Sequence, residues 1–159
     1  MSPTQQGSRS MRKSFLTAAL ALGLSVTALP ASAETIHLFG PFKGEHGATA
    51  PIKGSASAML DTTKNTLTYR FEDNGLTGPV TAIHLHGPAA EGEDAGVIAP
   101  INGPYQTRMT GTLNLTADQV KDVLAGKSYI NLHTEKFPDG EARAQLTTEL
   151  TGHKHHGNH

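Results

Sequence analysis

Two histidines one residue apart are the first residues whose types and spacing suggest chemistry. They are His84 and His86, in the apolar stretch AIHLHGPAA that ends at a Gly-Pro turn. Successive side chains of a strand point to opposite faces, so residues two apart share a face, with Cα atoms about 7 Å apart. In a strand over residues 80–86, Ile83 and Leu85 face the core and both imidazoles leave the other face together. Such a pair can chelate one metal ion.

Two later stretches place further polar residues in the same phase. In SYINLHT, alternation sets Ile130 and Leu132 toward the core and His133 away from it. In GEARAQL, it sets Glu141 and Arg143 away from the core. If the three strands are neighbours, these polar residues form one site on the outer wall of a barrel.

The three histidines have two interpretations. Neutral imidazole is a ligand for copper and zinc, and a set of three suits either ion. Because the chain has no cysteine, thiolates cannot contribute to such a site. A solvent-facing sheet surface also normally carries polar residues, however, and the histidines then only form hydrogen bonds on a wet face.

The elements that must position these residues are short strands. Runs rich in β-branched residues, separated by Gly, Pro, Asn and Asp, are typical of an all-β sandwich or barrel. The segment TADQVKDVLAGK differs: Thr116 as N-cap, Gln119 three residues later and Gly126 as a stop predict one short helix that crosses between strands. The expected strands span residues 35–39, 54–60, 66–72, 80–86, 96–99, 109–115, 128–133 and 142–150.

The N-terminal residues are typical of an export signal. Arg12 and Lys13 precede an apolar run that ends at Ala-Ser-Ala, a secretory cleavage pattern. The run is shorter than the roughly 20 residues that span a bilayer. We therefore expect a periplasmic or secreted protein, not inserted in the membrane once the signal is cleaved. The predicted segments are an N-terminal extension and signal over 1–33, a domain over 34–150 and a disordered His-rich tail over 151–159.

Charge and cysteine content limit the partners. All 14 acidic residues but only 10 of the 13 lysines and arginines follow residue 33, so the exported part carries a net charge of −4 with neutral histidine. Such a balance gives no reason to expect nucleic acid or an anionic membrane surface as a partner. Without cysteine, no disulfide stabilises the domain.

Two stretches resemble a known family. TAIHLHGPA and LTADQVKDVLAGKSYINLHTEKFPDGEARAQL resemble the CHRD domain, named from chordin and widespread in exported bacterial proteins. Its hallmark is H-x-H-G-P-A followed by Y-x-N-x-H-T and P-x-G-E-x-R-x-Q-L. The resemblance extends from Thr35 to about Leu146. The chain departs from the family at Ala142 and Ala144, where a larger aliphatic residue and glycine are usual.

The family has been likened to copper-zinc superoxide dismutases, which implies an immunoglobulin-like Greek-key sandwich or barrel. By that likeness, His84, His86 and His133 look like copper ligands, and Arg143 falls at the arginine that guides superoxide. No histidine lies between His86 and His133, so the enzyme's bridging imidazolate and zinc-binding loop are absent. The resemblance therefore implies copper and makes zinc the weaker candidate.

Further residues can complete such a site. His37 or His46 can add a ligand, although neither matches the dismutase pattern. Glu141 can pair with Arg143 or accept a hydrogen bond from a ligand histidine, which would orient its ring.

Three functions remain open at this point. The favoured one is a non-enzymatic copper-binding domain that uses the three histidines. The second is a module that binds an extracytoplasmic protein or polysaccharide and uses the histidines only structurally. The third is a dismutase-like copper redox enzyme in which Arg143 attracts an anionic substrate. Nothing in the sequence resembles a hydrolase nucleophile elbow, a phosphate-binding loop or a zinc-protease helix.

Overall fold

Alternating apolar and polar residues form eight strands, and one helix lies between the sixth and the seventh. The computed structural model describes residues 34–148 together with Met1. The elements in chain order are β1 (Thr35–Gly44), β2 (Lys53–Asp61), β3 (Thr66–Asn74), β4 (Val80–His86), β5 (Val97–Pro100), β6 (Arg108–Asn114), α1 (Ala117–Leu124), β7 (Ser128–Thr134) and β8 (Ala142–Thr148). Each predicted strand and the predicted helix has a counterpart.

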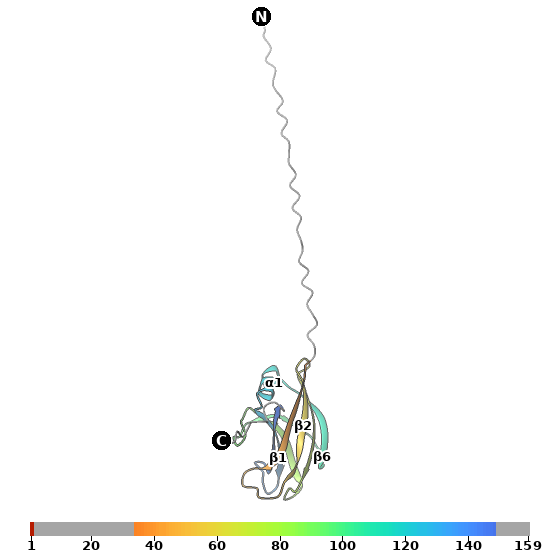
Figure 1. Ribbon diagram of the computed structural model, residues 1–159, viewed down its shortest axis with the longest axis vertical. Helices are drawn as coiled ribbons and strands as arrows, with labels where there is room; N and C mark the ends of the chain where they lie inside the picture. The colour runs from red at the N-terminus through yellow and green to blue at the C-terminus, as the bar shows by residue number, and fades with distance from the viewer. Residues whose placement is uncertain (2–33, 149–159) are drawn as a thin grey trace, which may run out of the picture. The chain divides into compact units, whose positions relative to one another are not determined.

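The strands pair antiparallel in the order β5-β4-β7-β8-β1-β2-β3-β6. The wall curls into a nearly closed barrel whose edge strands are β5 and β6, with α1 at one end (Figure 1). This confirms the predicted all-β fold with one short helix. The order also makes β4, β7 and β8 neighbours, which the prediction of one shared site required.

Inward-facing residues of the strands fill the barrel. On β3, this row consists of Leu67, Tyr69 and Phe71, all buried, and Phe71 packs edge-on against Phe42 of β1 with ring centroids 6.0 Å apart. Full burial of one such apolar side chain contributes about 1.5–3 kcal/mol. The next residue in the row is Asp73, a carboxylate that is buried as well.

Helix α1 begins and ends where the sequence predicts. The Thr116 side chain accepts a hydrogen bond from the Gln119 N–H, and the Gln119 side chain accepts one from the Thr116 N–H. Gly126 follows the helix with φ +70°, a conformation that favours glycine. The buried Val120 and Val123 attach the helix to the barrel core.

Strand β1 is longer than predicted. The prediction ended at Phe39, because Gly40 and Pro41 are typical strand breakers. In the structure, Gly40 instead lies where β8 approaches closely: a Cβ there would overlap the Gln145 carbonyl. The glycine therefore permits β1 to pair with β8 and continue.

Parts of the prediction concern residues that the structure does not describe. The export signal over 1–33, the end of the last strand at 149–150 and the tail over 151–159 lie outside the described residues, apart from Met1. Among the residues that are described, no helix has the length and hydropathy needed to cross a membrane.

Candidate metal centre

Strands β4 and β7 bring three histidines together. His84 and His86 alternate on β4 with the buried Ile83, and His133 on β7 lies opposite Ala82, diagonal to His84. All three rings therefore lie on the face of the barrel wall that points away from the core. This is the phase that the alternation predicts.

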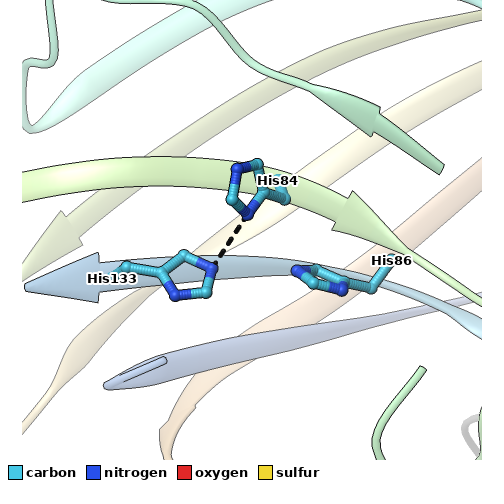
Figure 2. Close-up of side chains that lie close together, drawn as sticks. All are labelled: His84, His86 and His133. Atoms are coloured by element: carbon cyan, nitrogen blue, oxygen red, sulfur yellow. Dashed lines mark hydrogen bonds between the residues drawn. The ribbon is translucent and has the colours of Figure 1, made fainter. Parts of the chain in front are cut away.

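The three rings surround one small space (Figure 2). Nδ1 of His84 lies 3.1 Å from Nε2 of His133, and one ring nitrogen from each histidine lies within 4.8 Å of the other two. Two nitrogens bound to a tetrahedral ion at about 2.0–2.1 Å are about 3.3 Å apart. The three nitrogens would therefore have to move closer together to share one ion.

Backbone carbonyls fix the orientation of two rings. His86 Nδ1 donates to the Ala95 carbonyl at 2.8 Å, and His133 Nδ1 donates to the Pro138 carbonyl at 2.8 Å. Because a carbonyl can only accept, both rings carry a proton on Nδ1, and Nε2 of each neutral ring carries a lone pair. The lone pair of His133 Nε2 accepts the hydrogen bond from His84 Nδ1. The His86 Nε2 is buried and has no hydrogen-bond partner.

Burial favours neutral rings in this cluster. Desolvation lowers the pKa of His84 below 6.5, and the other two histidines lower it further. Desolvation also lowers the pKa of His86, although its bond to Ala95 opposes the change. A metal needs the neutral form of imidazole, so two of the rings are ready to bind at neutral pH.

A loop covers the cluster. The segment between β4 and β5, residues 87–96, is called the cover loop here. Its Ala95 N–H donates to the Tyr129 hydroxyl at 3.1 Å, and the Tyr129 ring stacks on His86 with centroids 5.0 Å apart. His86 is 9 % exposed under this loop, and His133, which bonds to the Pro138 carbonyl, is 7 % exposed. His86 and His133 therefore do not lie on a wet face, whereas His84 is only partly buried.

Arg143 holds the cover loop in place. Its guanidinium donates to the Ala90 and Glu93 carbonyls at 2.7 and 2.8 Å, to Glu45 at 3.0 Å and to Gln145 from two nitrogens. It is 3 % exposed and lies 3.5 Å from the centroid of the Tyr129 ring. Since these bonds engage all five donors, the predicted part in guiding an anionic substrate does not fit this geometry.

Glu141 is also placed differently from the prediction. It is fully buried and accepts hydrogen bonds from the Thr77 N–H at 2.7 Å, from the Thr77 hydroxyl at 2.9 Å and from the Thr134 hydroxyl at 2.6 Å. It makes no bond to Arg143 or to a ligand histidine among the described residues. Its carboxylate fixes the loop between β3 and β4 instead.

The two proposed extra ligands lie outside the cluster. His37 is exposed on β1, where its register partner is Met59 of β2. His46 donates from Nδ1 to the Gly140 carbonyl at 2.9 Å, and its Nε2 lies 3.4 Å from Asp94. Neither belongs to the group of ring nitrogens that faces the common space.

Comparison with known families matches residues 18–146 to the CHRD domain. The chain belongs to the CHRD domain family. No curated protein and no solved structure matches the chain. The family assignment is thus confirmed, while the finer likeness of this CHRD protein to superoxide dismutases remains a prediction.

Several residues that surround the histidine cluster and Arg143 were not predicted as site residues. Tyr129 and Gln145 share the outward phase of His133 and Arg143, so the alternation already carried a signal for them. Glu45 gave no such signal, because it follows β1 in a turn and meets Arg143 only through the fold.

Proposed function

We propose that this CHRD protein is exported and is a non-enzymatic domain that binds copper through His84, His86 and His133. One observation carries the proposal: the buried Nε2 of His86 has no hydrogen-bond partner and belongs to a group of three imidazoles. A buried polar atom without a partner costs about 1–3 kcal/mol. A bound ion would satisfy it.

The donor chemistry favours copper over zinc. The cluster offers three imidazole nitrogens and no thiolate. For such ligands, affinity among divalent ions peaks at Cu²⁺ and is lower for Zn²⁺. Structural zinc also usually takes four protein ligands, and the cluster has three. Export is inferred from the Arg-Lys, apolar and Ala-Ser-Ala pattern before Glu34.

Binding ranks above catalysis because of the surroundings of the cluster. A dismutase-like enzyme needs a cation that draws its anionic substrate toward the metal. Arg143, the residue expected to supply that charge, has all its donors engaged with protein acceptors.

One contact favours the structural alternative. His84 and His133 lie 3.1 Å apart and already share a hydrogen bond without any ion. Under this alternative, the histidines stabilise the wall and the cover loop, and the domain binds a protein or polysaccharide elsewhere.

Metal titration separates these functions. A chain ending at residue 150 removes the tail histidines, and Cu(II), Cu(I) and Zn(II) are titrated against a competing chelator. We expect one copper ion per chain and an affinity at least about 100-fold lower in His86→Ala, since loss of a ligand exceeds the usual cost of losing an outer partner. The control is His37→Ala, an exposed histidine outside the cluster, with unchanged affinity.

The same samples give a stability readout. Copper at 100 times the wild-type Kd should stabilise the wild type by about 2.7 kcal/mol and His86→Ala by no more than about 0.4 kcal/mol. If His86→Ala lowers the melting temperature while copper leaves the wild type unmoved, the structural alternative holds and the copper proposal is wrong.

A further inference from the structure

Asp73 is a buried carboxylate at the end of the inward-facing row of β3. It is 4 % exposed, and its Oδ1 has no hydrogen-bond partner. The Asp73 N–H donates to the Thr107 carbonyl at 2.9 Å, which fixes the strand end but leaves that oxygen unsatisfied. Burial raises the pKa of Asp73 to about 6, and the neighbouring Glu72 carboxylate adds to the rise. A carboxylate in such a place is costly and calls for a compensating partner.

A cavity of about 380 Å³ opens beside this carboxylate. One wall is the loop between β3 and β4, which contributes Leu76 and Pro79, together with Val80 at the start of β4. The other wall contains Tyr105 before β6. The volume lies within the range of small-molecule sites, and barrel mouths are among their usual places. The cavity therefore combines one carboxylate with apolar and aromatic walls.

The wall of this cavity is fixed in advance of any ligand. Thr77, in the middle of the loop, is held by two hydrogen bonds to the fully buried Glu141. Gly75 has φ +90°, and a Cβ at that position would lie 2.6 Å from the Pro51 carbonyl oxygen. Such preorganisation reduces the entropy that a ligand must overcome on binding.

The surroundings of Asp73 select among cations. Calcium and magnesium are held by several oxygen ligands and usually by more than one carboxylate. Among residues 34–148, the histidine cluster is the only group of three or more His, Cys, Asp or Glu that could hold an ion. An ammonium group needs only one carboxylate, and its carbon body can contact Leu76 and Val80. A tyrosine ring such as Tyr105 attracts organic cations as well.

We propose that this cavity binds a small organic cation whose primary ammonium group donates a hydrogen bond to Asp73 and whose carbon body lies against Tyr105. The site is independent of the copper proposal, because it uses none of the three histidines.

Amide chemical shifts of the ¹⁵N-labelled full chain test the proposal. The probes are butylammonium and benzylammonium chloride, with butanol and benzyl alcohol as neutral counterparts of the same shape. We expect the ammonium probes to shift the amides of residues 73–78, 80 and 105–107 with Kd values in the millimolar range. The alcohols should leave these amides unmoved.

Two substitutions sharpen the test. Asp73→Asn keeps the side-chain shape and should weaken ammonium binding at least tenfold, whereas Asp118→Asn removes an exposed carboxylate on α1 and should change nothing. Tyr105→Ala, at a partly exposed position, should weaken benzylammonium at least threefold, and it supplies a second readout should Asp73→Asn not fold.

Three results would overturn the proposal. The first is alcohol binding as tight as ammonium binding, and the second is unchanged ammonium binding in Asp73→Asn. The third is calcium chloride producing the same shifts in the wild type and not in Asp73→Asn, which would make the cavity a site for an inorganic cation.

Discussion

Two regions of the barrel's outer surface follow the same alternation of side chains but differ in what lies over them. On β7 and β8, residues that point away from the core lie under loops: Tyr129 and Arg143, which bond to the cover loop, are 1 % and 3 % exposed, and His133, which bonds to Pro138, is 7 % exposed. On β1 and β2, the corresponding residues face solvent, with Phe39 48 % and Met59 45 % exposed. Strand periodicity thus decides which way a side chain points, and a loop decides whether that direction leads to water.

The two walls also differ in how their polar groups are solvated. The solvent-facing wall carries Phe39 and Met59 among polar residues such as Ser57 and Arg70, and exposed apolar side chains are common on protein surfaces. The covered wall carries an arginine, histidines and a tyrosine, and each such polar group needs a partner. The covered wall should therefore respond strongly to substitution and the solvent-facing wall weakly.

The largest difference in stability is expected between two single variants, each of which removes an arginine from one of the two walls. Arg143→Met removes the donor to Glu45 Oε1 and one donor to each of two loop carbonyls, and breaking a buried pair in this way costs about 3–5 kcal/mol. Arg70→Met, on the exposed face of β3, should change stability by less than about 0.5 kcal/mol. Urea unfolding at neutral pH measures both. Equal losses would show that the cover loop does not distinguish the two walls.

A pair of threonines gives the next largest difference. Thr134 is 1 % exposed, and its hydroxyl donates to Glu141 at 2.6 Å. Thr134→Val leaves the buried carboxylate short of a donor and should cost about 1–3 kcal/mol. Thr68→Val removes an exposed bond to Thr112 and should cost less than about 0.5 kcal/mol. The same unfolding assay checks the pair, and a larger loss at Thr68 would contradict the account.

The smallest expected effect is the change in the free energy of unfolding with pH. Burial lowers the pKa of His84 and His86, so the folded, metal-free protein binds these protons less readily than the unfolded chain does. Their contribution to stability is full above pH 6.5 and is lost as the pH falls through 6.5 toward the folded pKa values.

Unfolding at about pH 5 and about pH 7.5 measures this contribution by linkage. The wild type should lose more stability on acidification than the double variant His84→Gln/His86→Gln. Asp73 and His46 have raised pKa values, which contribute with the opposite slope, but both chains contain them and the comparison cancels them. Equal losses in the two chains would show that burial does not disfavour the charged rings.

Local periodicity made much of the fold predictable. The alternation around Ile83 and Leu132 identifies the strands and places His84, His86 and His133 on one face, because strand geometry depends only on neighbouring residues. The capping box of Thr116 is likewise a local signal.

Contacts between distant segments were not predictable. Arg143 bonds to backbone carbonyls about 50 residues earlier in the chain, at Ala90 and Glu93. A carbonyl is present at every residue, so the sequence carries no mark of which one accepts. Glu141 accepts from Thr77, 64 residues away, and not from Arg143, which lies nearer in the sequence. The covering of the site could therefore be learned only from the fold.

The most direct test of the central claim is the position of copper in crystals of the copper-loaded protein. Anomalous scattering measured at the copper absorption edge locates the ion without assumptions about its ligands. We predict one peak under the cover loop, about 2.0–2.1 Å from one nitrogen each of His84, His86 and His133. A peak at any other residues, with none between these three rings, would contradict the account.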